Sequence, residues 1–281
     1  CGLVPVLYGG FMTHTSPNWQ VISARPGNSP IANLTNSILD HLIKENRFNE
    51  ADRAIQHAII GSVLRSGPSG LVEVAKYIQA QEGENIFFLI DQFEELFRFK
   101  DSSDDEFANE AALYVNLILT AINQRDTPIY LAINMRSDFI GECSGFHGLT
   151  QMINSSNYLV PQMTREQKRM AIEGPVAVGG GKISSRLVKR LMTDIGDNQD
   201  QLPIMQHALM RTWDYWMANR EPGEPMDIRH YNAIGKISQA LSLHANEAYE
   251  ELSSREKEIA EVIFKKIKEK SQENQGLSSP I

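Results

Sequence analysis

The 281-residue sequence contains only two cysteines, Cys1 and Cys143. Two cysteines are too few for a disulfide framework or for a zinc site built from cysteine ligands, and this scarcity fits a reducing, cytoplasmic location. Histidines do not predict a zinc site either, because none of the seven falls into the H-E-x-x-H spacing or a comparably close one. We therefore expect neither disulfides nor a zinc centre.

The sequence also lacks an excess of positive charge and long apolar runs. Lysine and arginine total 27 against 35 aspartates and glutamates, so the net charge is −8. This sign disfavours a protein whose affinity comes from nucleic-acid phosphates. The longest apolar stretches, such as residues 86–90, fall far below the roughly 20 residues that span a bilayer. Nucleic acids and membranes are therefore not the expected partners.

A hydrophobic content of 42% supplies enough apolar surface for a sizeable core. Apolar or β-branched segments predict strands, and segments with apolar residues three and four positions apart predict amphipathic helices between them. The predicted strands are 19–25, 86–90 and 129–133, and the predicted helices are 31–42, 54–64, 69–81 and 105–124. This alternation predicts an α/β fold with a doubly wound parallel sheet.

After Pro161 the pattern changes to helices only. Thr164 and Gln167 have the spacing of a capping box, in which each side chain bonds the other residue's backbone N–H. The predicted helices are 165–173, 184–195, 202–218, 237–252 and 254–270. We predict an α/β domain over residues 1–162, a helical domain over 163–235 and a further helical region over 236–281.

The strongest chemical pattern is the segment FFLIDQFEE, in which a buried strand ends at Asp91. Ligands of open α/β sheets bind at the carboxyl edge, where an aspartate commonly holds Mg²⁺ beside nucleotide phosphates. Alternatively, Asp91 only ends the strand and caps the next helix. Glu94 and Glu95 are candidates for orienting a water molecule, or they simply complement a helix N-terminus.

A second group of polar residues follows the next predicted strand. Asn134, Arg136 and Asp138 stand beside Asp91 if the two strands are neighbours. The Arg136 guanidinium is suited to bidentate binding of a terminal phosphate. The alternative, equally weighted, is a salt bridge from Arg136 to Asp138 or Asp91.

A phosphate-cradling loop, G-x-x-x-x-G-K-[ST], is expected to accompany such an aspartate. No segment of the 281 residues matches it. Residues 176–183 come nearest, but Val176 replaces the first glycine and Ile183 replaces the hydroxyl residue. We predict that these glycines form a connector between helices.

Several blocks of sequence resemble a known family. They are 18–34, 87–97, 131–140, 160–175, 202–213 and 241–252, and DQFEELF together with LPIMQHAL is the most specific combination. The chain resembles the STAND-type P-loop ATPases, in particular the bacterial novel STAND NTPase 1 family, which is related to AAA+ proteins. The resemblance implies a P-loop NTPase-like domain, a helical lid, the start of a winged-helix-like domain, and ATP or ADP with Mg²⁺ as cofactors.

The family motifs assign roles to individual residues. Asp91 resembles the Walker B aspartate, Arg136 the sensor beside the γ-phosphate, and Pro203 the lid proline near the adenine. Two positions depart from the wider AAA+ pattern: Gln92 replaces the catalytic glutamate, and Gln201 replaces the glycine of a Gly-x-Pro motif. Slow or absent hydrolysis is the consequence, so enzymatic activity stays open, with Glu94 or Glu95 as substitute bases.

In that family the Walker A loop lies just upstream of a segment like residues 1–11. We therefore expect the chain to begin immediately after this loop, to lack the first strand of the sheet, and to bind nucleotide weakly by itself. The implied function is a signalling switch in which ATP or ADP, bound between core and lid, controls the domain arrangement. The alternative is a non-catalytic scaffold. Protein partners or fused sensor or effector domains are expected, and the oligomeric state stays open.

Overall fold

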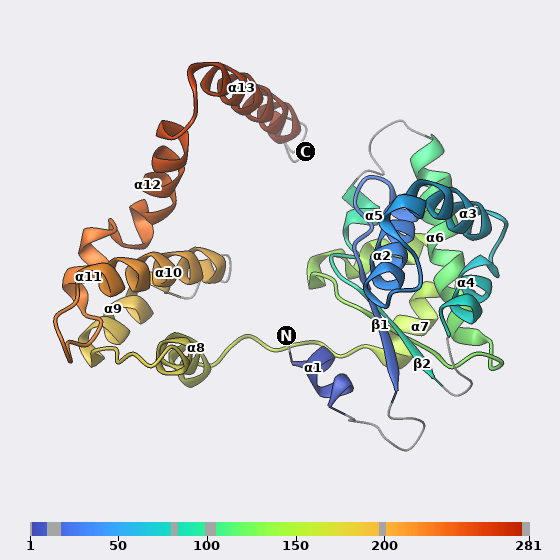
Figure 1. Ribbon diagram of the computed structural model, residues 1–281, viewed down its shortest axis with the longest axis horizontal. Coiled ribbons are helices and arrows are strands. Elements are labelled where there is room, and N and C mark those ends of the chain that lie inside the picture. Colours follow the sequence, from blue (N-terminus) through green and yellow to red (C-terminus); the bar gives the residue numbers. More distant parts are fainter. Residues whose placement is uncertain (1, 10–17, 80–83, 99–104, 197–200, 277–281) are drawn as a thin grey trace. The chain divides into compact units, whose positions relative to one another are not determined.

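The computed structural model describes residues 2–9, 18–79, 84–98, 105–196 and 201–276. The chain forms two compact units, Cys1–Leu159 and Val160–Ile281 (Figure 1). The first combines a sheet with helices, and the described part of the second contains helices and no strand. None of the helices in the described ranges combines the length and hydrophobicity that a membrane span requires.

The first unit contains a parallel sheet of three strands in the order β1-β2-β3. The strands are β1 (Trp19–Ala24), β2 (Asn85–Ile90) and β3 (Ile129–Ile133). In the register, Val21 of β1 lies opposite Phe87 of β2, and Phe88 lies opposite Leu131 of β3. The predicted strands and their parallel, mixed α/β arrangement are confirmed, with boundaries shifted by at most one residue.

The main core lies on one face of this sheet. Because successive side chains of a strand point to opposite faces, Ile22, Phe88 and Ile90 enter this core while their neighbours do not. The helices that pack there are α2 (Pro30–Lys44), α3 (Arg53–Arg65), α4 (Gly70–Ile78) and α6 (Asp105–Asn123). The predicted amphipathic helices are confirmed, except that the one predicted over 69–81 ends at Ile78, where Gln79 turns to an extended conformation; residues 80–81 lie outside the described residues.

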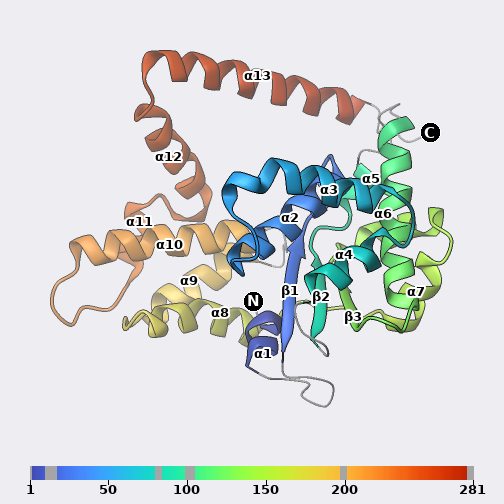
Figure 2. The same ribbon diagram turned by 45° about the vertical axis from the view of Figure 1, so that its right-hand side comes forward.

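The opposite face of the sheet carries a much smaller cluster. Leu7 of α1 (Leu3–Tyr8) packs there with Trp19 and Phe87. Figure 2 shows α1 beside the start of β1. Within the described ranges α1 is the only helix in this cluster, and Tyr130 of β3 stays 38% exposed. β3 is accordingly less buried than β2, which is the central strand of the three.

Short helical segments connect these elements. They are η1 (Glu50–Asp52), α5 (Glu95–Arg98), η2 (Ser137–Gly145) and α7 (Leu149–Ser156). The sequence analysis predicted none of them, since each is too short to show a helical period. α7 is anchored by Leu149, which is buried in the main core.

The second unit is helical, and among its described residues all helices except the last, 254–276, contribute to a core that includes Trp216 and Tyr231. The helices are α8 (Arg165–Val178), α9 (Ser185–Ile195), α10 (Gln201–Asn219), α11 (Ile228–Ala233), α12 (Lys236–Glu250) and α13 (Ser254–Gly276). The predicted capping box is confirmed: the Gln167 backbone N–H donates to Thr164 Oγ1 at 3.2 Å, and the Thr164 N–H donates to Gln167 Oε1 at 2.8 Å.

The predicted end of α8 at residue 173 is wrong. The helix continues through Pro175 to Val178. A proline inside a helix removes one backbone hydrogen bond, but Ile172 and Val176 lie one turn apart and are both buried in the second core. Their burial keeps the chain helical across the proline.

The connector between α8 and α9 is glycine-rich for a steric reason. A Cβ atom on Gly179 or Gly181 would lie 2.6 Å or 2.7 Å from the Trp213 ring. Only glycine permits the backbone to approach the indole this closely. The prediction that this segment connects two helices is confirmed.

Replacing the fully buried Phe88 by alanine is expected to lower the free energy of unfolding of the first unit by about 3–5 kcal/mol. The loss combines the transfer of the ring with the cavity left in the main core. Urea denaturation followed by circular dichroism measures it. The exposed Ile55 of α3 provides the control, because Ile55→Ala should change the free energy by less than about 0.5 kcal/mol. Equal effects of both variants would contradict the assigned core.

Tyr114 of α6 should make the first unit sensitive to alkaline pH. Its hydroxyl is buried without a hydrogen-bond partner among the described residues, and burial raises the pKa of this phenol well above its ordinary value. The folded state therefore holds the proton more tightly than the unfolded state, where the pKa is about 10. Stability should fall as the pH rises above that value.

Tyr114→Phe should remove this part of the pH dependence and raise the free energy of unfolding by about 1 kcal/mol at neutral pH, since the unpaired hydroxyl is lost. Denaturant unfolding at pH 7 and at several alkaline values measures both effects. Tyr77→Phe, at a half-exposed tyrosine, is the control. A variant that loses stability at pH 7 would show that the Tyr114 hydroxyl is satisfied.

Candidate functional site

The carboxyl edge of the sheet brings together three polar residues that are distant in sequence. Arg25 follows β1, Asp91 follows β2 and Asn134 follows β3. Backbone hydrogen bonds continue the ladder past the strand ends: the Asp91 N–H donates to Ala24 O at 2.9 Å, and the Asn134 N–H donates to Ile90 O at 2.8 Å. Strand pairing itself therefore fixes these positions.

Asp91 is the centre of this group. Its Oδ2 accepts hydrogen bonds from Nε and Nη2 of Arg25 at 3.1 Å and 2.9 Å, and its Oδ1 accepts one from Asn134 Nδ2 at 2.9 Å. The Arg25 side chain is 63% exposed and that of Asp91 27%. An ion pair this exposed contributes only about 0–1 kcal/mol, so it orients the carboxylate more than it stabilises the fold.

The backbone turns sharply directly after Asp91. Gln92 has a φ of 55°, in the left-handed region that non-glycine residues rarely adopt. The turn allows Phe93 to return into the main core, where it is fully buried, while the Gln92 side chain stays exposed. This conformation costs about 1 kcal/mol, and it separates the aspartate from the glutamates that follow.

The two glutamates occupy different environments. Glu95 Oε2 accepts a hydrogen bond from the Gly27 backbone N–H at 2.8 Å and so ties the loop after β1 to the segment after β2. Glu94 is only 5% exposed, and its Oε2 is buried with no hydrogen-bond partner among the described residues. Glu94 therefore keeps an acceptor available, whereas Glu95 already serves a structural contact. The role of either in orienting water stays a prediction.

Arg136 forms one of the two salt bridges that the sequence left open. Its Nε and Nη2 donate to Oδ1 and Oδ2 of Asp138 at 3.1 Å and 2.9 Å, and both side chains are more than half exposed. The phosphate-sensing role of Arg136 stays a prediction. Pro203 lies in the second unit, exposed in the first turn of α10, where a helix tolerates proline because the N–H has no intrahelical partner.

Sequence analysis identified Asp91 and placed Asn134 beside it, and the 2.9 Å hydrogen bond between them confirms that placement. It missed Arg25. The sequence contained a signal that could have identified it. Arg25 ends the predicted strand 19–25 directly before a Pro-Gly turn, and Asp91 was identified because it ends its strand in the same way.

The oxygen atoms at this edge are suited as ligands for a hard divalent cation. Asp91 offers carboxylate oxygens, and Asn134 can present its amide oxygen by rotating about χ2. In the part of the chain that the structure describes, no group of three or more histidine, cysteine, aspartate or glutamate residues could hold a metal ion. One carboxylate with few other protein ligands fits Mg²⁺, which keeps water molecules and shares phosphate oxygens with a nucleotide.

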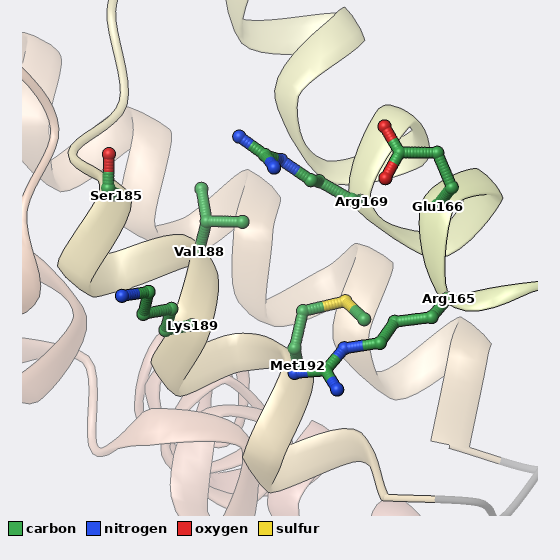
Figure 3. Close-up of a pocket in the computed structure, with 7 residues that line it drawn as sticks. All are labelled: Arg165, Glu166, Arg169, Ser185, Val188, Lys189 and Met192. Atoms are coloured by element: carbon green, nitrogen blue, oxygen red, sulfur yellow. The ribbon is translucent and has the colours of Figure 1, made fainter.

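A pocket of about 370 Å³ lies between α8 and α9 of the second unit (Figure 3). Arg165, Glu166 and Arg169 from α8 face Val188 and other residues of α9, with Ser185, Lys189 and Met192 completing the lining. Arg169 is paired with Glu173 at 3.0 Å. The lining contains none of the residues predicted from the sequence to bind metal or nucleotide, so the candidate site stays at the sheet edge.

Comparison with known proteins identifies one family. The model of the novel STAND NTPase 1 family matches residues 1–279, nearly the whole chain. No curated protein and no solved structure matches the chain.

Replacing Gln92 by glycine should relieve the left-handed backbone strain beside Asp91. We expect the free energy of unfolding to rise by about 0.5–1 kcal/mol, since glycine adopts a positive φ at no steric cost. Urea denaturation measures the change. Asn46 provides the matched control, because it is exposed and also has a positive φ, of 57°.

Asn46→Gly should stabilise less than Gln92→Gly, because asparagine tolerates the left-handed region better than glutamine. A loss of stability in Gln92→Gly would show that the glutamine side chain makes a compensating contribution.

Proposed function

This chain belongs to the novel STAND NTPase 1 family, and we propose that it is the nucleotide-binding switch region of a STAND signalling ATPase. The observation that carries the proposal is the Asp91 carboxylate at the carboxyl edge of a parallel sheet, held by Asn134 from the neighbouring strand. Ligands of open α/β sheets bind at this edge. The family supports nucleotide binding, and the edge geometry supports this place for it in the proposal.

In this proposal Asp91 holds Mg²⁺, which when bound neutralises negative charge on the phosphate oxygens of ATP or ADP. Arg136 contacts the terminal phosphate, and Pro203 packs near the adenine. Of the two glutamates, Glu94 is favoured as the residue that orients water, because its buried Oε2 lacks a partner among the described residues while Glu95 is bonded to Gly27. Gln92 in place of a glutamate supports slow hydrolysis.

Arg136 gives the switch a means of distinguishing ATP from ADP. Its guanidinium is bidentate to Asp138 and exposed, so contact with a γ-phosphate requires a change at this pair. A nucleotide shifts a conformational equilibrium only by the difference in its affinity for the two states. The γ-phosphate supplies such a difference, and Arg136 is the residue we assign to detect it.

The 281 residues contain no G-x-x-x-x-G-K-[ST] motif, so in this proposal the phosphate-binding loop comes from a segment other than these residues. The structure offers a position for its strand. Among the described strands β3 pairs only with β2, and Tyr130 on the less covered face is partly exposed. A further parallel strand beside β3 would bring its loop to the same edge as Asp91.

A non-catalytic scaffold of the same fold is the second candidate function. The specific observation in its favour is that the charge of Asp91 is already balanced by Arg25 and that both carboxylate oxygens accept hydrogen bonds. A protein that never binds metal at Asp91 would show the same arrangement.

Isothermal titration of the full-length protein with ATP and ADP in the presence of Mg²⁺ separates the two functions. Asp91→Ala should weaken binding of both nucleotides at least about tenfold, equivalent to about 1.4 kcal/mol. Arg136→Ala should weaken ATP binding more than ADP binding, because only ATP carries the γ-phosphate.

Arg65→Ala removes a comparable ion pair, to Glu110 at 2.7 Å on the surface of the first unit, and should leave both affinities unchanged. Unchanged affinities in Asp91→Ala and Arg136→Ala would contradict the assigned roles. Absence of nucleotide binding by the unsubstituted protein would favour the scaffold.

A further inference from the structure

We propose that Arg25 is a built-in competitor for the divalent cation at Asp91, so that the cation reaches Oδ2 of the carboxylate only when the guanidinium leaves it. This inference rests on the proposed function, because it concerns the same metal position. It adds a residue that neither the motif pattern nor the family comparison assigns, and it gives that residue a regulatory role.

The contacts of Asp91 carry the argument. Arg25 approaches Oδ2 with two nitrogen atoms, at 3.1 Å and 2.9 Å, and so engages both lone pairs of this oxygen. Asn134 donates a single hydrogen bond to Oδ1, at 2.9 Å. Oδ2 is therefore available to a metal only after Arg25 moves, and coordination by both oxygens needs the same change.

The two neighbours differ in what they offer a metal. Asn134 is neutral and carries an amide oxygen, so a rotation of its side chain converts it from a donor to a ligand. Arg25 is always positively charged and has no acceptor atom, so it can only repel a metal and cannot bind one. Binding of a cation at Oδ2 therefore requires the displacement of Arg25 in particular.

The position of Arg25 is fixed by the loop that follows it. The Gly27 N–H donates to Glu95 Oε2 at 2.8 Å, and Asn33 Nδ2 donates to Pro26 O at 2.7 Å. Gly27 itself has a φ of +58°, and a Cβ there would lie 2.5 Å from Asn33 Nδ2. The backbone beneath Arg25 is thus held in one conformation, so its contact with Asp91 is set by the fold.

The guanidinium can nevertheless leave. Its side chain is 63% exposed, and water replaces much of what it loses when an exposed ion pair opens. The backbone contacts of Gly27 and Pro26 do not involve the Arg25 side chain, so the loop stays in place when the side chain swings away. Arg25 therefore lowers the affinity for the cation without blocking the site, and its release reports that the cation is bound.

The test uses Mn²⁺ alone as the probe, without nucleotide, and measures its dissociation constant on the full-length protein by electron paramagnetic resonance of free Mn²⁺. Arg25→Ala should bind Mn²⁺ about fivefold more tightly than the unsubstituted protein, the factor that an ordinary exposed ion pair contributes. Arg25→Lys should stay close to the unsubstituted affinity, because it retains the positive charge. Arg65→Ala should leave the affinity unchanged.

Asp91→Asn, alone and combined with Arg25→Ala, should abolish this binding, which assigns the Mn²⁺ to Asp91. Circular dichroism and the thermal midpoint without metal establish that each variant is folded, and Arg25→Gln replaces Arg25→Ala if the alanine variant does not fold.

The outcomes separate the competitor role of Arg25 from the metal-binding role of Asp91. Mn²⁺ binding that depends on Asp91 but has the same affinity in Arg25→Ala would overturn the competitor role and leave the proposed metal site intact. Absence of Asp91-dependent Mn²⁺ binding in both the unsubstituted protein and Arg25→Ala would overturn the competitor role together with the assignment of Asp91 as the metal ligand.

Discussion

The parallel pairing of β2 with both β1 and β3 is the interaction on which the rest of the first unit depends. Parallel strands end at the same edge, so this pairing alone brings Arg25, Asp91 and Asn134 together from distant parts of the sequence. It also sends the alternating residues of β2 into two separate clusters, with Phe88 in the main core and Phe87 on the less covered face. The same hydrogen-bond ladder therefore sets both the packing and the candidate site.

The chemistry of that edge depends on a balance of charge around Asp91. A carboxylate that accepts from an arginine and an asparagine is well oriented, yet it is held weakly because the arginine is largely exposed. Such an arrangement suits a residue that exchanges one cation for another. The strained backbone at Gln92 and the Glu95 bond to Gly27 hold the flanking segments in place, so exchange at Asp91 involves side chains more than backbone.

The match to the novel STAND NTPase 1 family covers both the unit with the sheet and the helical unit. The first unit supplies the residues proposed to contact metal and terminal phosphate, and the second supplies Pro203 on an exposed first helical turn. In the proposed switch, groups on both units respond to the same nucleotide. Under the same proposal, the glutamine at position 92 favours signalling by occupancy over rapid turnover.

The sequence by itself determined the strands and the positions of the long helices, but not the short helical segments between them. Apolar runs located all three strands within one residue, helical periods located the long helices, and the motif FFLIDQFEE identified Asp91 as the residue at the strand end. Only the tertiary structure decided the partners of these residues. The pairing of Arg136 with Asp138 depends on side-chain rotamers within one segment. The bond from Gly27 to Glu95 and the contact of Arg25 with Asp91 depend on distances between segments that are far apart in the sequence. Local patterns encode periodicity and burial, whereas the ion pair between Arg25 and Asp91 exists because β1 and β2 become neighbours.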